Sequence, residues 1–572
     1  MILVFGGTTE GRKAAEVLEE GGTTYYYSTK TGEQNITLHH GQRIDGALDG
    51  EAMCKFCREH DIRLIVDAAH PFASVLHETI VSVASSLQIP VIRYERIYPP
   101  RDPEMTWIDD YSQVPNDIQS LLATTGVQSI NKLKWLETEG VKVIYRILNR
   151  ESSLETAHQQ GAKDEQLCFY EDGAMPDADA ILLKESGESG GFCEKIAEAK
   201  ARNMRIIVLK RPIITQKVPS LLCNGPYGLR RAVEKLLPEF YPLHSGLTTG
   251  TCATAAATAA TIRLLKNEMP KEVPVLLPDG ETIQVSVGYG EDYAYCIKDA
   301  GDDPDVTNGI EVRASVKPAD TFEIIGGEGV GRFTLPGFDF PPGDAAINKA
   351  PREMIRKNIK EDMRIIISVP NGAEVARRTF NPRLGIEGGI SIIGVSGIVK
   401  PFSEEAFIDS IRKCMNVAQA SGTSRVVINS GGKSERFVKA LYPNLPQQAF
   451  VEYGNFVGET LKIAHELDIK NITLGVMLGK AVKLAAGQLD THSRKATMNK
   501  TFIQQMLDET GCQADVEKIT LARELWQVIP QEKIEDFCHV VLKHCLQHCS
   551  PLVPQARLTL LLIDDDGTIH SL

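Results

Sequence analysis

A regular alternation of apolar β patterns and helical patterns is the strongest constraint on the first 237 residues. Ile2–Phe5 is a short apolar run followed by glycines and a helical segment, and the same order recurs from residue 62 and from residue 180. Strands that alternate with helices form parallel sheets covered by helices on both faces. The length of this α/β region suits two such sheets, and we expect them to divide near residues 125–140.

The alternation ends at a short stretch that contains Pro238 and Pro242. We expect residues 238–245 to be a linker between a first unit, residues 1–237, and a second unit, residues 246–572. The second unit begins with β-rich segments and continues with another α/β run from residue 363. This order predicts a mixed α/β (α+β) fold for the second unit.

Composition and charge exclude several classes of function. The formal net charge of −13 argues against nucleic-acid binding through a global basic field. No apolar stretch is long enough to span a membrane, and the N-terminus lacks a signal-peptide pattern, so we expect a cytoplasmic protein. Scattered cysteines are typical of reduced thiols. Cys54 and Cys57, and the His/Cys pairs within 544–549, are interpreted as helix-packing residues, and no metal site is predicted.

The first glycine loop lies between the opening strand and helix. Such a loop lets the backbone approach a phosphate, and the following helix N-terminus offers free N–H groups. The loop lacks the GxGxxG spacing, so a tight turn without a ligand is the alternative. The residues that we assign to a nicotinamide cofactor here are Gly6, Gly7, Thr8, Thr9, Gly11 and Ser28.

Two later loops carry groups that suit anions. "DAAHPFA" places His70, Pro71 and Phe72 after a strand, at the edge where α/β proteins bind ligands. Arg93 and Arg96 follow the next strand, and arginine binds carboxylates through two parallel hydrogen bonds. We assign these five residues to substrate binding. "KESGESGG" is a further strand-to-helix loop, and we assign its Lys184, Ser186 and Gly187 to cofactor binding.

These loops, in this order, carry a resemblance to a known family. "ILVFGGTTEGR", "DAAHPFA", "TTG" at 124–126, "KESGESGG" and "KRP" at 210–212 resemble precorrin-6A reductase. The resemblance implies two Rossmann-like lobes and NADH or NADPH as reductant of a corrin macrocycle. Ala69 stands where the family has threonine, which removes a hydroxyl from the loop. Lys30 favours the 2′-phosphate of NADPH and Glu33 opposes it, so the choice of cofactor stays open.

The second unit opens with "TTGTCATAAATAA", a glycine turn followed by an alanine-rich helical pattern. Three further segments stand out: an acidic turn, a glycine-dense segment, and a helix with two lysines that ends near a histidine. We interpret the acidic turn as a base or cation site, the glycines as a cofactor site and the remaining residues as substrate contacts. The residues are, respectively, Asp302, Asp303 and Asp305; Gly385, Gly388, Gly389, Gly394 and Gly397; and Thr249, Gly250, Thr251, Lys480, Lys483 and His492.

These segments resemble the cobalt-precorrin-5B C1-methyltransferase family. The carrying motifs are "TTGTCA", "GDDPDVTNG", "NPRLGIEGGISIIGVSGIVKP", "YGNFVGETLK" and "GKAVKLAAGQLDTHS". The resemblance implies transfer of a methyl group from S-adenosylmethionine to C1 of a cobalt-corrinoid, followed by reduction in the first unit. One departure is "INSGGKSERF", where the family has a Gly-Asn loop; Asn429, Gly431 and Gly432 are the residues that stand there.

Two other functions remain open at this point. The chain is a methyltransferase whose first unit only binds ligand, or a tetrapyrrole carrier without enzymatic activity. The expected partner is a small cobalt-corrinoid in each case, with no nucleic acid and no membrane. The sequence leaves the oligomeric state, including a homo-oligomer, undecided.

Overall fold

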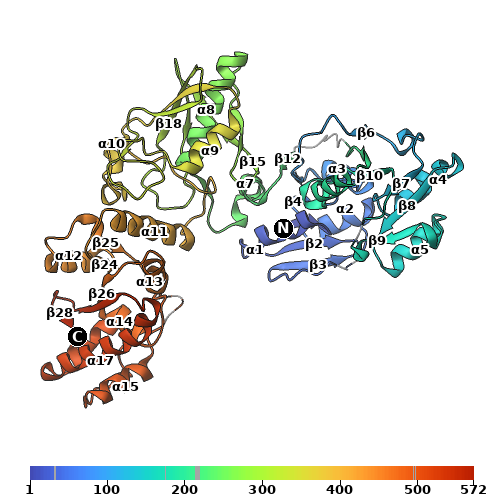
Figure 1. Cartoon of the computed structure of the whole chain (residues 1–572). Helices are drawn as coiled ribbons and strands as arrows, with labels where there is room; N and C mark the ends of the chain where they lie inside the picture. Colours follow the sequence, from blue (N-terminus) through green and yellow to red (C-terminus); the bar gives the residue numbers. More distant parts are fainter. Residues whose placement is uncertain (31, 33, 174, 213–219, 494, 496) are drawn as a thin grey trace. The chain divides into compact units, whose positions relative to one another are not determined.

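The computed structural model describes the chain except residues 31, 33, 174, 213–219, 494 and 496. It divides into two compact units (Figure 1). The first comprises Met1–Ser245 together with Leu276–Gln284, and the second comprises Gly246–Val275 and Val285–Leu572. Each unit is described by itself.

The first unit contains two six-stranded sheets, and every strand pairing in them is parallel. The first sheet has the order β12-β5-β4-β1-β2-β3 and the second has the order β6-β11-β10-β7-β8-β9. The chain enters the second sheet through β6 and returns to the first through β12. The bounds are β1 Ile2–Phe5, β2 Tyr25–Thr29, β3 Gly41–Asp45, β4 Leu64–Asp67, β5 Val91–Tyr94, β6 Thr106–Ile108, β7 Ser120–Ala123, β8 Lys142–Ile147, β9 Leu167–Phe169, β10 Ala180–Lys184, β11 Arg205–Leu209 and β12 Ser220–Cys223.

Helices of the first unit begin at the loops that the sequence marks. Helix α1 starts after Thr8, whose side chain accepts a hydrogen bond from the Gly11 N–H, and it buries Ala14, Ala15 and Leu18. The parallel α/β architecture expected for this half is confirmed. The expected division near residues 125–140 is wrong, because β7 and β8 on either side of it pair in the second sheet and the chain passes between the sheets from β5 to β6. The helices are α1 Thr9–Glu19, α2 Gly50–Glu59, α3 Ser74–Leu87, α4 Ile130–Thr138, α5 Glu151–Gln159, α6 Phe192–Ala201 and α7 Pro226–Leu236.

A buried carboxyl group holds the segment Leu276–Gln284 in the first unit. Glu281 is 2% exposed, and its Oε2 accepts hydrogen bonds from the N–H groups of Tyr227 (2.9 Å) and Gly228 (3.1 Å) at the start of α7. Its Oε1 is buried without a hydrogen-bond partner among the described residues. Burial, aided by the charge of Asp279, raises the pKa of Glu281 to about 8.

Helix α8, Thr249–Lys266, lies at the centre of the first part of the second unit. Thr248 caps it, and its residues from Thr249 to Thr261 are all buried. The helix packs against α9 (Lys349–Asn358) and against β17 and β18. The small side chains of α8 therefore serve close helix–sheet packing. The surrounding sheet has the order β16-β17-β18-β21-β19, with bounds β16 Gly288–Tyr289, β17 Ala294–Ile297, β18 Glu311–Pro318, β19 Glu323–Gly326 and β21 Met363–Ser368.

The second part of this unit is built on a five-stranded sheet of order β25-β24-β26-β27-β28. Its strand pairings are parallel except that of β28 with β27. The strands are β24 Val426–Asn429, β25 Phe450–Glu452, β26 Asn471–Met477, β27 Arg557–Ile563 and β28 Ile569–Ser571. The helices are α11 Glu404–Ala420, α12 Gly432–Leu441, α13 Val457–Glu466, α14 Leu478–Ala485, α15 Lys500–Glu509, α16 Leu525–Val528 and α17 Ile534–Cys549.

Short elements complete the second unit. They are α10 Gly372–Ala376 and the strands β13 Gly246–Leu247, β20 Arg332–Phe333, β22 Ile386–Glu387 and β23 Ile398–Val399. The glycine-dense segment 381–401 is therefore mostly irregular. The paired strands β14 Glu272–Leu276 and β15 Thr282–Ser286 straddle the boundary, because Leu276–Gln284 belongs to the first unit.

Candidate functional site

The strand order of the first sheet places a crevice beside its central strand. β1 lies between β2 and β4, so the chain leaves β1 to one side and returns on the other. Ligands of open α/β sheets bind at such a switch point, outside the carboxyl ends of the strands. The loops there are Gly6–Thr9 and Ala68–Phe72, and Thr8 Oγ1 joins them by donating to the Ala68 carbonyl over 2.7 Å. The sequence placed both loops at one edge, as observed.

Different physical constraints require glycine at each position of the first loop. A Cβ at Gly6 would lie 2.2 Å from the ring of Tyr27, and one at Gly11 would lie 2.6 Å from the Gly6 Cα. Gly7 has φ +82 and faces open space. Gln34 was missed by the sequence reasoning: its Oε1 accepts from the Gly7 N–H over 3.1 Å. A phosphate on this loop would take the place of that amide oxygen.

Ser28 contributes to this edge through its backbone, since its carbonyl accepts from the Gly6 N–H over 2.9 Å. Its side chain is buried, and the cofactor contact assigned to it stays a prediction. Lys30 is exposed just after β2, whereas Glu33 lies outside the described residues. Of the two residues expected to influence the choice between NADH and NADPH, the structure therefore describes only Lys30.

The second sheet has a corresponding switch point between β7 and β10. Thr124–Gly126 follows β7, and Lys184–Gly187 lies at the end of β10. Lys184 Nζ lies 5.1 Å from the centre of the Phe72 ring. Burial lowers the pKa of Lys184 to about 8. Among the described residues no carboxylate acts on the pKa of Lys184, and the charge of Lys132 lowers it further.

Arg96 joins the two switch points. It is 7% exposed, its Nε donates to Glu10 Oε2 over 2.8 Å, and its Nη1 donates to the Ser186 carbonyl over 2.7 Å. Ser189 also donates to Glu10. A side chain at Gly187 would strike the Ile97 carbonyl at 2.8 Å, which explains glycine there. Glu10 sits in the first turn of α1 and was not singled out from sequence, because its partners lie 86 and 179 residues away.

Arg93 has a different position from Arg96. It is 2% exposed, and its Nη1 donates to Asp67 Oδ1 over 2.9 Å and to the Ala69 carbonyl over 3.1 Å. His77 binds the other oxygen of Asp67 over 2.6 Å. The structure thus brings Arg96 to the crevice and places Arg93 beneath the loop, where it holds the backbone that precedes His70.

The His-Pro-Phe loop faces several cations. His70 Nδ1 accepts from the Phe72 N–H over 3.2 Å, which leaves the proton of a neutral ring on Nε2. Burial lowers the pKa of His70 to about 4, and the charges of Arg96 and Lys184 act in the same direction. Pro71 is buried. His70 is therefore neutral near pH 7 and suits the role of a hydrogen-bond donor.

A second cluster of cations lies around Tyr170, which the sequence reasoning missed. Arg146 lies 4.9 Å and Lys195 Nζ 5.3 Å from the centre of its ring. Arg146 is 6% exposed, and its Nε has no hydrogen-bond partner among the described residues. Burial lowers the pKa of Lys195, and the charge of Arg146 adds to the effect. The edge of the second sheet is thus built to neutralise anions, within a chain of net charge −13.

In the second unit, the first turn of α8 is fixed by hydrogen bonds and contacts with other parts of the same unit. Thr249 Oγ1 accepts from the Ile393 N–H over 2.9 Å, and Thr251 Oγ1 donates to the Gly397 carbonyl over 2.6 Å. A Cβ at Gly250 would lie 2.8 Å from Pro351. These substrate-binding candidates therefore lie against the glycine-dense segment, and their contacts are with the protein itself.

The glycine-dense segment is packed in the same way. A Cβ at Gly385 would strike Leu335, one at Gly389 the Gly329 carbonyl and one at Gly394 the Thr248 side chain, each within 2.4 Å. Gly388 has φ +82 and faces open space. Gly397 has φ 87 and supplies a carbonyl to Thr251. Gly385, Gly389 and Gly394 thus permit close approaches to the protein's own atoms, whereas Gly388 has room beside it.

The acidic turn is ordered by an ion pair. Asp305 Oδ2 accepts from Lys298 Nζ over 2.6 Å, and its Oδ1 accepts from the Thr307 N–H and hydroxyl. Burial acts to raise the pKa of Asp305, but Lys298 and the hydrogen bonds outweigh it and the pKa is lowered. Asp303 accepts from the Phe402 N–H over 3.0 Å, and Asp302 is exposed.

The two lysines lie on one helix, α14, as expected. Lys480 donates to the Gly454 carbonyl, and Lys483 donates to the Thr491 carbonyl over 3.2 Å. Burial lowers the pKa of Lys480 to about 8. The His492 N–H donates to Asp490. Lys480 and Lys483 share α14, and the hydrogen bond from Lys483 to Thr491 brings the neighbouring His492 close to this helix.

Comparisons with known proteins match the two halves of the chain to two different families. The family model described as precorrin-6x reductase CbiJ/CobK matches residues 1–223, the CbiD model matches residues 238–401, and the CbiD C-terminal domain model matches residues 490–571. The cobalt-precorrin-5B C(1)-methyltransferase of Prosthecochloris aestuarii (strain DSM 271 / SK 413) is 42% identical over 352 residues, which cover 57% of this chain and 95% of that protein. The chain belongs to the cobalt-precorrin-5B C(1)-methyltransferase family.

Other relatives carry the same name or a related one. The cobalt-precorrin-5B C(1)-methyltransferase of Geobacillus sp. (strain WCH70) is 40% identical over 323 residues, covering 53% of this chain and 88% of that protein. A crystal structure of cobalamin biosynthesis protein (cbiD) from Archaeoglobus fulgidus has 30% identity, a TM-score of 0.27 and coverage of 44% and 84% of the two chains. A CobK precorrin-6A reductase structure has 15% identity, a TM-score of 0.34 and coverage of 41% and 96%.

Both predicted families are thereby confirmed. This member of the methyltransferase family carries a precorrin-6 reductase domain at its N-terminus. The chain is a bifunctional enzyme of cobalamin biosynthesis, with a methyltransferase half and an oxidoreductase half. In the described residues, no helix is long and apolar enough to cross a membrane.

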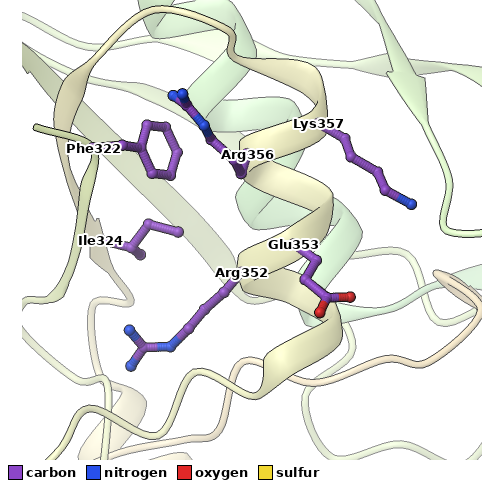
Figure 2. A pocket seen from close by; sticks show the side chains of 6 residues that line it. All are labelled: Phe322, Ile324, Arg352, Glu353, Arg356 and Lys357. Atoms are coloured by element: carbon purple, nitrogen blue, oxygen red, sulfur yellow. The ribbon is translucent and has the colours of Figure 1, made fainter.

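A surface hollow of about 410 Å³ in the methyltransferase half contains none of the predicted site residues. Figure 2 shows Arg352 and Arg356 of α9 on the side of the helix where Phe322 and Ile324 lie. Arg352 donates to the Ile347 carbonyl over 2.8 Å, and Arg356 donates to the Glu361 carbonyl over 3.2 Å and lies over the Phe322 ring. Both arginines therefore have partners within the protein, namely the backbone on either side of α9 and the ring of Phe322 just before β19.

The cysteines near the C-terminus of the chain, Cys545 and Cys549, lie in α17. Cys545 and Cys549 are fully buried, and burial raises the pKa of Cys549 to about 12. His544 lies 2.9 Å from Glu509. Across the described part of the chain, no group of three or more His, Cys, Asp or Glu side chains is arranged to hold a metal ion.

Proposed function

We propose that the methyltransferase half converts cobalt-precorrin-5B to cobalt-precorrin-6A with S-adenosylmethionine, and that the reductase half then converts this product to cobalt-precorrin-6B with NADH or NADPH. Membership in both families supports the reactions. The observation that carries the reductase assignment is the pair of switch-point loops joined by Arg96, beside Lys184. A glycine loop next to a cation-rich edge suits a nucleotide next to a carboxylated macrocycle.

In the reductase half, the loop Gly6–Thr9 is the proposed position of the nicotinamide cofactor. Gly7 faces open space, so a phosphate fits beside its backbone once Gln34 moves away. When bound, NADH or NADPH would supply a hydride to C19 of the macrocycle, and the second hydrogen would be added as a proton from solvent. Lys184 and Arg96 neutralise carboxylates of the macrocycle, and neutral His70 donates a hydrogen bond from Nε2. Alignment of the reacting carbons supplies most of the acceleration in such transfers.

In the methyltransferase half, Lys480, Lys483 and His492 are the proposed contacts of the macrocycle carboxylates. When bound, S-adenosylmethionine supplies an electrophilic methyl group, whose bond to sulfur breaks as C1 of the macrocycle attacks in line. Asp302, Asp303 and Asp305 are proposed to face the sulfonium or to accept a proton. The ion pair with Lys298 favours an electrostatic role for Asp305, because a carboxylate of lowered pKa is a poor base.

The decisive assay is anaerobic incubation with cobalt-precorrin-5B, S-adenosylmethionine and either NADH or NADPH, followed by mass spectrometry. We expect the gain of one methyl group, and then of two hydrogens only when the nicotinamide cofactor is present. Methylation that never leads to reduction would show a first half that binds without catalysis. No change at all, with substrate verified by a known enzyme, would favour the carrier function.

Variants of the acidic turn test the methyltransferase residues. We expect Asp303→Asn and Asp305→Asn to slow methylation at least tenfold while reduction of added cobalt-precorrin-6A stays unchanged. Unchanged methylation in both variants would refute a role for this turn.

A further inference from the structure

The C-terminal sheet of the methyltransferase half has its own switch point. β24 lies between β25 and β26, and all three strands are parallel. The chain passes from β24 to β25 on one side through α12 and later returns to β26 on the other side. The carboxyl ends of β24 and β26 therefore border a crevice of the kind that binds ligands in open α/β sheets. Residues 402–489, which contain these three strands, lie between the two matched CbiD models.

A glycine loop and a carboxylate meet at this edge. Gly431 follows β24 with φ +88, and a Cβ there would lie 2.2 Å from Glu452 Oε1 at the end of β25. The side chain of Asn429 is fully buried and fixes the loop, because its Oδ1 accepts from the Gly431 N–H over 2.8 Å. Only glycine lets the loop pass directly beneath the Glu452 carboxylate.

Glu452 keeps hydrogen-bonding capacity for a ligand. Its side chain is 27% exposed, and no donor among the described residues forms a hydrogen bond with it. The nearest cation is Arg383 Nη1 at 3.9 Å, which lies closer to Glu435, at 2.8 Å. Burial raises the pKa of Glu452, while the charges of Arg383 and Lys480 oppose the shift. A carboxylate in this state gains from neutral hydroxyl donors.

We infer that this edge binds the adenosyl group of S-adenosylmethionine, with Glu452 accepting hydrogen bonds from the two ribose hydroxyls above the Gly431 loop. An acidic residue at the end of the next strand, about 20 residues after the glycine loop, binds the ribose diol of nucleotides in this way. Arg383 belongs to the glycine-dense segment, so that segment reaches the same edge. The inference rests on the proposed function in one respect, namely that the methyl donor is S-adenosylmethionine.

Calorimetric titration of the full-length chain with S-adenosylhomocysteine tests the site, with NADP⁺ present at saturation to fill the reductase half. A second ligand is the analogue that lacks the ribose 2′-hydroxyl. We expect the unmodified chain to prefer the ribose ligand at least tenfold, and Glu452→Gln to lose that preference. Glu459→Gln is the matched control, because Glu459 is exposed on α13 and pairs with Lys462 over 2.7 Å. The control should retain the preference.

The two ligands separate a binding role from misfolding. A Glu452→Gln chain that still binds the 2′-deoxy ligand with the affinity of the unmodified chain is folded, and its lost preference then supports the ribose contact. Equal preference in Glu452→Gln, Glu459→Gln and the unmodified chain would overturn the inference while leaving the proposed function intact. Failure of the unmodified chain both to bind S-adenosylhomocysteine and to methylate would instead refute the proposed function. Loss of binding to both ligands in Glu452→Gln, with an unchanged unfolding temperature, would place Glu452 in the site without the diol contact and would overturn the inference in its stated form.

Discussion

Replacement of Arg93 by methionine gives a sharp test of the reductase architecture. Arg93 was assigned to substrate binding from sequence, yet it is 2% exposed and pairs with Asp67, which is 4% exposed. Loss of one partner of a buried pair leaves an uncompensated charge and costs about 3–5 kcal/mol. For a unit of this size each kcal/mol lowers the unfolding temperature by about 2–4 °C. We therefore expect the first unit to unfold about 6–20 °C lower in Arg93→Met.

Differential scanning calorimetry of the full chain measures this effect, since the second unit provides an internal reference transition. Arg101→Met is the matched control, because Arg101 pairs with Glu185 but its side chain is 47% exposed. Exposed pairs contribute about 0–1 kcal/mol, so the control should unfold within about 4 °C of the unmodified chain. A normal unfolding temperature in Arg93→Met, together with weaker binding of the macrocycle, would refute the structural role and return Arg93 to the substrate site.

Three further predictions concern titratable groups. The folded pKa of Glu281, about 8, lies above its unfolded value, so protonated Glu281 contributes stability at low pH that is lost as the pH rises toward 8. The free energy of unfolding should therefore fall between pH 5 and pH 8 in the unmodified chain, and Glu281→Gln should remove the part of that fall that comes from Glu281. The folded pKa of His70, about 4, lies below the unfolded value of about 6.5, so His70 should contribute about 3 kcal/mol to the loss of stability from pH 6.5 to pH 4, and His70→Gln should lack that contribution. Asp305→Asn should destabilise the second unit by about 3 kcal/mol, because Lys298 is 2% exposed and loses its charge partner; an unchanged denaturant midpoint would contradict this.

Local sequence was sufficient where the deciding interactions are local. The strand-loop-helix order around Ile2–Thr9 predicted a glycine loop before a helix, and the structure has this loop, with Thr8 as the N-cap of α1. The β-α alternation predicted parallel sheets, because few other arrangements accommodate that order. The alanine-rich pattern after Thr249 predicted a helix, and α8 begins there and is buried along residues 249–261.

Contacts between distant residues could not be predicted in this way. Arg93 and Arg96 lie three positions apart, yet Arg93 neutralises Asp67 beneath the sheet edge and Arg96 spans both crevices through Glu10. Nothing within the local sequence separates these roles, since each depends on a partner 26 or 86 residues away. The same limit applies to Glu452, whose relation to Gly431 depends on which strand lies next to β24.

The charge distribution ties the proposed reactions to the fold. A chain of net charge −13 repels a polycarboxylated macrocycle at long range, so capture requires cations held at fixed positions. Burial lowers the pKa of both Lys184 and Lys480 to about 8, which marks the cost of keeping each ammonium group out of water. Carboxylates of the ligand relieve that cost. Lys184 is the last residue of β10, and Lys480 lies in the first turn of α14, directly after β26; both strands border a switch point. The same physical solution thus recurs in the two halves, because a sheet edge supplies converging loops and burial makes each lysine favour a bound anion.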